Sequence, residues 1–223
     1  MHDFKGAIFD MDGTLLDSMP VWKRLTQGYL SQFGLHITDQ DYAVTEGFSQ
    51  PQVAQYFIER YPELPIDVQS MMDGMDRLIT ARYETIARPK DGVFRFLEGL
   101  RRRGVKMAIA TLTARRHAEK ALRDRGMLNY FAFMLTIEDV GISKHEPDIY
   151  LRAAERLGVP LSQTAVVGDQ IFTDVFGGNR VGALTCYVQT LDRRFFWVNV
   201  RYQLERGFIE RGRRRREARA RHD

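Results

Sequence analysis

Short apolar runs alternate with amphipathic stretches along most of the chain. Runs of strand length occur at 7–9, 106–110, 133–136, 165–167 and 184–188, and apolar residues recur at helical spacing in 93–103, 113–125, 147–157 and 173–180. Strands that alternate with helices form a parallel sheet with both faces covered. The pattern therefore predicts an α/β fold built on a doubly wound parallel sheet.

The segment after the first predicted strand shows helical spacing alone. Helices are predicted over 21–33, 38–46, 50–61 and 66–87, with prolines at 62 and 65 between the last two. Turn-forming residues bracket the segment at 18–20 and at 88–92. We therefore expect an all-helical insertion, called the cap below, at 19–88. The core would comprise 1–18 and 89–192, followed by a basic extension at 193–223.

Composition narrows the class of protein. The chain has 223 residues and a net charge of +4, but the last eighteen residues hold eight arginines against three acids, so the remainder is close to neutral. The single cysteine, Cys186, lies in an apolar stretch and is expected to be buried packing. No apolar run reaches the length of a membrane span and no signal peptide is recognisable, so we expect a cytoplasmic protein.

Two aspartates stand where the first predicted strand ends. The stretch Ala7-Ile8-Phe9-Asp10-Met11-Asp12-Gly13-Thr14 runs from buried strand into a glycine turn. Open α/β sheets bind ligands at the carboxyl ends of their strands. Paired acids at such a position favour metal-assisted chemistry, although an acidic turn that only caps a helix has the same local appearance.

Polar or charged residues also follow the later predicted strands. The strand at 106–110 ends at Thr111, with Thr113 as a nearby alternative; Lys144 precedes Pro147 at a helix start; and the strand at 165–167 is followed by Gly168, Asp169 and, five residues on, Asp174. In this order, after Asp-x-Asp-Gly-Thr, the chain resembles the haloacid dehalogenase-like superfamily of phosphohydrolases. The resemblance is closest to the helical-cap phosphatases and β-phosphoglucomutases. One departure is His145, where the family often has proline directly after the lysine.

The resemblance implies a role for each of these residues. Asp10 would be the nucleophile and Asp12 the general acid/base, while Thr111 and Lys144 would bind the phosphoryl group. Mg²⁺ would be held by Asp10, the backbone carbonyl of Asp12, Asp169 and Asp174. This cation suits the chemistry, because a carboxylate that approaches a phosphate dianion is repelled by several kcal/mol unless positive charge intervenes.

The residue types also separate branches of the superfamily. An acid at position 12 is absent from dehalogenases and replaced by threonine in transport ATPases, so Asp12 points to phosphatases and phosphomutases. In the cap, Gly47 and Ser49 resemble the substrate loop. The mutase branch places basic residues in this loop, whereas 44–55 contains none, which favours hydrolysis of a small organic phosphate monoester.

Two alternatives stay open. One is a β-phosphoglucomutase-like enzyme, which would isomerise a phosphosugar without releasing phosphate. The other is a non-catalytic binding protein that acts through the arginine-rich segment, where aromatic residues beside arginines suit an anionic surface such as a membrane. The sequence makes no strong case for nucleic-acid binding and leaves the oligomeric state unknown. A disordered, solvated tail is the simpler interpretation of the arginine-rich segment.

Overall fold

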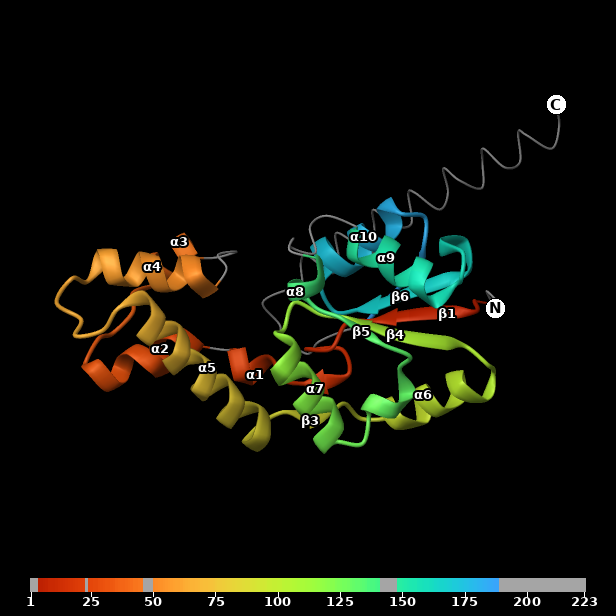
Figure 1. Ribbon diagram of the computed structural model, residues 1–223, viewed down its shortest axis with the longest axis horizontal. Helices are drawn as coiled ribbons and strands as arrows, with labels where there is room; N and C mark the ends of the chain where they lie inside the picture. Colours follow the sequence, from red (N-terminus) through yellow and green to blue (C-terminus); the bar gives the residue numbers. More distant parts are fainter. Residues whose placement is uncertain (1–3, 23, 46–49, 141–147, 189–223) are drawn as a thin grey trace, which may run out of the picture.

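A five-stranded sheet forms the centre of the computed structural model, which describes residues 4–22, 24–45, 50–140 and 148–188 (Figure 1). The strand order is β5-β4-β1-β6-β7, and every pairing is parallel. The strands are β1 (Gly6–Phe9), β4 (Lys106–Ala110), β5 (Met134–Leu135), β6 (Thr164–Gly168) and β7 (Leu184–Tyr187). Because the chain winds outward from β1 in both directions, the sheet is doubly wound, as the hydrophobic pattern predicts.

Side chains of β1 alternate between the two faces of the sheet. Ala7 and Phe9 join a buried cluster with helices α6 (Val93–Arg102) and α7 (Arg115–Asp124). Ile8 packs on the opposite face with α9 (Asp148–Leu157). Helices α6 and α7 thus lie on one side of the sheet and α9 on the other (Figure 1). Burial on both faces explains why the central strands are continuous apolar runs in the sequence.

Short elements complete the core. They are the 3₁₀-helices η2 (Leu128–Tyr130) and η3 (Leu161–Gln163), the helices α8 (Ile137–Val140) and α10 (Phe176–Arg180), and the π-helical turn η4 (Ile171–Val175). The sequence predicts an α-helix from Thr173, but the structure begins at Ile171 with a π-helical turn. Such turns occur often at functional sites.

The cap consists of the helices between β1 and α6. They are α1 (Met19–Trp22), α2 (Leu25–Leu30), η1 (Ser31–Phe33), α3 (Asp39–Thr45), α4 (Gln50–Arg60) and α5 (Val68–Thr85). Phe57, Met71 and Met75 belong to a buried cluster of the cap's own. The single helix predicted over 21–33 is wrong, because Arg24 adopts a left-handed conformation (φ 51°) and separates α1 from α2.

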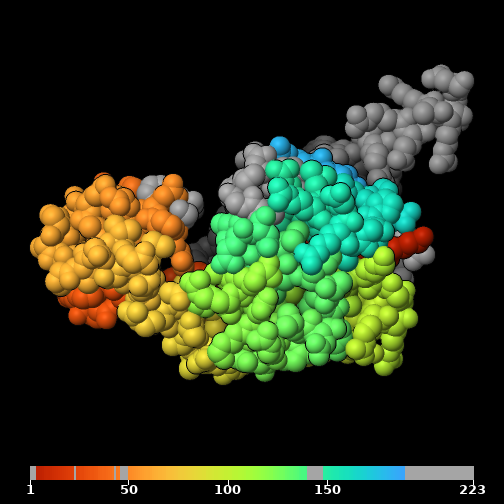
Figure 2. All heavy atoms as spheres, in the orientation of Figure 1, coloured from red at the N-terminus to blue at the C-terminus, as the bar shows by residue number. Residues whose placement is uncertain are grey.

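A small antiparallel ladder joins the cap to the core. Strand β2 (Leu16–Asp17) pairs with β3 (Arg88–Pro89), so the two chain crossings run side by side. Local hydrophobic periodicity does not predict strands this short. Beyond this ladder, cap helix α5 packs on core helix α7, and an indentation separates cap helices α3 and α4 from the core (Figure 2).

Two surface observations complete the fold. Cys186 is exposed, so its expected burial is wrong; β7 is an edge strand whose side chains are at most half-buried. Among the described helices, none combines the length and the apolar character that crossing a bilayer requires.

Candidate active site

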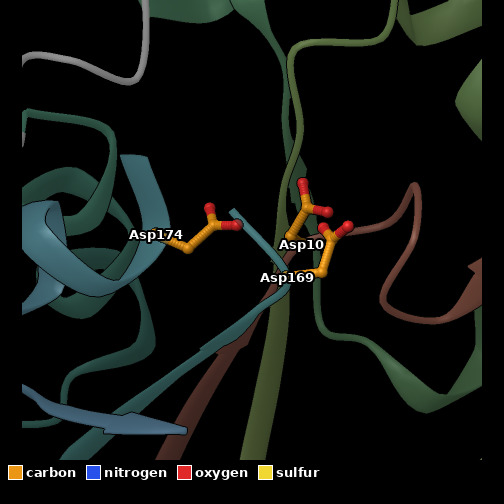
Figure 3. A group of neighbouring side chains, drawn as sticks. All are labelled: Asp10, Asp169 and Asp174. Atoms are coloured by element: carbon orange, nitrogen blue, oxygen red, sulfur yellow. The ribbon is translucent and has the colours of Figure 1, made fainter. Parts of the chain in front are cut away.

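Three carboxylates converge at the carboxyl edge of the sheet. Asp10 directly follows β1, Asp169 directly follows β6, and Asp174 comes from η4. All three are buried, and each offers an oxygen within 4.8 Å of the others. Figure 3 shows the carboxylates of Asp10 and Asp169 side by side, with that of Asp174 directed toward them from the helical turn.

The parallel register brings the first two acids together. Phe9 of β1 pairs with Val167 of β6, and the Asp10 amide continues the ladder by donating to the Val167 carbonyl at 2.9 Å. Parallel neighbours leave a sheet at the same edge, so the residues that follow them meet. The expected grouping of Asp10 and Asp169 therefore follows from the order of the strands.

The turn after Asp10 fits closely against Asp169. Gly13 has φ +78°, and a Cβ built on it would lie 2.6 Å from Cγ of Asp169. The adjacent hydroxyl of Thr14 lies 3.2 Å from Oδ2 of Asp10 and 3.3 Å from Oδ1 of Asp169. Glycine is needed here for its backbone conformation and its lack of a side chain, and Thr14 ties the two acids together.

Asp174 is oriented by its own turn and by α9. Its Oδ2 accepts from the backbone amide of Gln170 at 3.1 Å, and its Oδ1 accepts from the Tyr150 hydroxyl at 2.7 Å. Gly168 leaves the space that Asp174 occupies, because a Cβ on Gly168 would overlap the Asp174 side chain. The acid is thus held toward Asp10 and Asp169 by contacts from both sides.

This donor set fits a hard divalent cation. Three buried carboxyl groups lie within 4.8 Å of one another here, and carboxylates this close would repel strongly unless a cation lay between them. Mg²⁺ prefers carboxylate oxygens with octahedral geometry and retains some of its water. Asp10, Asp169 and Asp174 are therefore the described residues that could hold it.

The Asp12 side chain is not part of this group of three carboxylates. It accepts hydrogen bonds from three hydroxyl groups instead. Its Oδ1 accepts from Ser18 at 2.5 Å and from Tyr83 at 2.6 Å, and its Oδ2 accepts from Thr113 at 2.6 Å. The three donors come from the single residue between β2 and α1, from cap helix α5 and from the loop after β4. Burial, followed by the charge of Asp12, raises the pKa of Tyr83, so its hydroxyl stays protonated and donates.

Of the remaining predicted site residues, Thr111 is among those that the structure describes and the others are not. Thr111 is buried at the end of β4, and its hydroxyl accepts from the backbone amide of Thr113 at 3.1 Å. Lys144, Gly47 and Ser49 lie outside the described residues, as does the basic segment 193–223. Their predicted roles stay predictions.

Several contacts of the site have little or no sequence signal. Thr14 belongs to the Asp-x-Asp-Gly-Thr motif, and Tyr150 follows the Lys144 motif, so both stand close to recognisable positions. Tyr83 is 71 residues from Asp12 and occupies one position in a periodic apolar helix. Only the packing of the cap on the core brings it to the site.

Comparison with known proteins agrees with this arrangement. The model of the haloacid dehalogenase-like hydrolases matches residues 4–182. The chain belongs to this family. The relatives of this haloacid dehalogenase-like hydrolase include phosphatases. N-acetylmuramic acid 6-phosphate phosphatase of Pseudomonas aeruginosa is 28% identical over 191 residues, which cover 83% of this chain and 81% of the relative. Fructose-1-phosphate phosphatase of Escherichia coli is 28% identical over 173 residues, which cover 76% and 88%.

A solved structure shows the same fold. The putative beta-phosphoglucomutase from Thermotoga maritima matches with a TM-score of 0.70 and 24% identity, over 84% of this chain and 87% of the other. With phosphatases matching over most of its length, this haloacid dehalogenase-like hydrolase is a phosphoric monoester hydrolase. The sheet and helical cap are those that the sequence motifs imply.

Proposed function

We propose that this hydrolase is a Mg²⁺-dependent phosphatase of small organic phosphate monoesters that works through an aspartyl-phosphate. The observation that carries the proposal is the group of three buried carboxylates, Asp10, Asp169 and Asp174, at the carboxyl edge of the sheet. Such a group suits a cation that offsets the charge of a phosphate dianion.

The reaction consists of two displacements at phosphorus. A carboxylate oxygen of Asp10 attacks, the bond from phosphorus to the ester oxygen breaks, and the electron pair leaves with that oxygen. Asp12 delivers a proton to the departing alkoxide. A water molecule then attacks the aspartyl-phosphate while Asp12 takes its proton, and the bond from phosphorus to Asp10 breaks, which releases inorganic phosphate.

Other residues would hold the phosphoryl group and the substrate. Bound Mg²⁺ would supply positive charge that draws the phosphate oxygens toward Asp10. Thr111 and Lys144 would hold the phosphoryl oxygens by a hydroxyl and an ammonium group. Gly47 and Ser49 of the cap would contact the leaving group, and the cap would exclude water from the site.

The relatives support a small phosphorylated metabolite as the substrate. Those compared above are named for N-acetylmuramic acid 6-phosphate and fructose-1-phosphate. The mutase alternative predicts a different product, an isomerised phosphosugar with little free phosphate. A cytoplasmic location, and contact of segment 193–223 with an anionic surface, are further parts of the proposal that rest on the sequence alone.

The test replaces the nucleophile with its nearest neutral analogue. Asp10→Asn should lower release of phosphate from 4-nitrophenyl phosphate with Mg²⁺ by at least about a thousandfold, because the neutral amide is not a carboxylate nucleophile. Asp17→Asn, an exposed aspartate of β2, is the matched control and should retain activity. Near-normal turnover by Asp10→Asn would refute the mechanism. A screen of phosphorylated metabolites that yields isomers in place of phosphate would select the mutase.

A further inference from the structure

Tyr83 connects the cap directly to the predicted proton-transfer group. It lies near the carboxyl end of cap helix α5, and its hydroxyl donates to Oδ1 of Asp12 at 2.6 Å. The same carboxylate accepts from Ser18 at 2.5 Å and from Thr113 at 2.6 Å. The connection between β2 and α1, the cap and the core therefore each supply one hydroxyl to Asp12.

The Tyr83 ring is held on two sides. The indole of Trp22 meets it edge to face, with 6.1 Å between ring centroids and 82° between planes. The imidazole of His117 on α7 stacks against it at 6.3 Å and 18°. The side chain is 3% exposed, so it has little room to turn.

The backbone around Tyr83 is anchored to the core as well. Arg125, which follows α7, donates to the carbonyl oxygen of Tyr83 near the end of α5 and to that of Ala87 just beyond it. A side-chain hydrogen bond also joins α5 and α7, since Nε2 of His117 lies 2.5 Å from Oδ1 of Asp76 on α5. The placement of the Tyr83 hydroxyl is thus determined by the docking of α5 on α7.

We propose that Tyr83 is a positioning residue for Asp12. Its hydroxyl fixes the direction of the Asp12 carboxylate, so the cap contributes to proton transfer through this contact as well as by covering the site. The inference rests on the proposed function, in which Asp12 protonates the leaving group. It assigns a role in the proton-transfer step to a residue of the cap helix that packs on the core.

The test is Tyr83→Phe, which removes the hydroxyl and keeps the ring between Trp22 and His117. Turnover is compared on an alkyl phosphate, whose leaving group needs a proton, and on 4-nitrophenyl phosphate, whose leaving group needs one far less. General acid/base catalysis contributes about 10²–10⁴-fold, so loss of one of three positioning hydrogen bonds should lower kcat on the alkyl ester by about tenfold. On the aryl ester kcat should fall by less than about threefold, and KM should stay within about twofold for both.

Two further variants separate positioning from a structural effect. Tyr61→Phe removes a comparable bond within the cap, a hydroxyl 2.9 Å from Oδ2 of Asp41, and should leave the ratio of alkyl to aryl turnover unchanged. In an Asp12→Ala background, Tyr83→Phe should cause no further change in that ratio, because Tyr83 acts through Asp12.

The outcomes are distinguishable. Equal losses on both esters, no loss, faster alkyl turnover, or an additive effect in the Asp12→Ala background would each overturn the role of Tyr83 while the phosphatase proposal stands. A wild-type protein inert toward both esters, or an Asp12→Ala variant without leaving-group dependence, would overturn the acid role of Asp12 and this inference with it.

Discussion

Gly13→Ala tests how closely the turn after Asp10 is fitted to Asp169. At φ +78° an alanine would be strained by roughly 1–2 kcal/mol, which corresponds to a fall in Tm of about 2–8 °C for a chain of this size. Its Cβ would also lie 2.6 Å from Cγ of Asp169, where carbon atoms normally approach no closer than about 3.5 Å. One of the two groups must therefore move by about 1 Å.

A displacement of this size at a catalytic group can lower activity by about a hundredfold, and we expect that loss of kcat/KM on 4-nitrophenyl phosphate with Mg²⁺. Gly104→Ala is the matched control, because Gly104 has φ +71° but nothing within 4 Å of the added Cβ. It should show a similar fall in Tm in a thermal melt and retain activity within about twofold. If both variants lose stability equally and both remain active, the close fit of Gly13 to Asp169 does not matter for catalysis.

Two further measurements address the cation and the cap. Mg²⁺ at about a hundred times its Kd should stabilise the fold by about 2.7 kcal/mol and raise Tm by about 5–11 °C; EDTA should reverse this and Asp169→Asn should abolish it, whereas an unchanged melt would count against the metal site. In the cap, burial opposes ionisation of Asp41, but hydrogen bonds from Thr38, Tyr56 and Tyr61 outweigh it and lower the pKa of Asp41 to about 2. Because the folded-state pKa is depressed, this stabilisation is present above about pH 4 and is lost as the pH falls toward 2. With solvent screening allowed for, Asp41→Asn should reduce the free energy of unfolding in urea by roughly 1–2 kcal/mol at pH 7 and by much less at pH 2, and equal losses at both pH values would contradict the linkage.

Sequence patterns predict some of the contacts in the candidate active site and miss others. Asp10 and Asp169 could be placed together because each directly follows a buried strand, and neighbouring parallel strands end at one edge. The family resemblance implies that Asp174 lies near them, but the π-helical turn and the Tyr150 hydroxyl that orient it have no periodic signature. Of the hydroxyl groups that bind Asp12, that of Ser18 is six residues away, but those of Tyr83 and Thr113 are 71 and 101 residues away, so no local pattern contains them.

Hydrophobic periodicity by itself determined the alternation of strands and helices in the core and the helical insertion. It also gave the exact bounds of strand β4, because burial on both faces of a sheet leaves an uninterrupted apolar run. Tertiary structure alone decided the break at Arg24, the β2–β3 ladder, the exposure of Cys186 and the placement of Tyr83 against Asp12. The physical reason is the range of the interactions. Periodic burial depends on residues a few positions apart, whereas these features depend on how the cap packs on the core and which strand lies at the edge of the sheet.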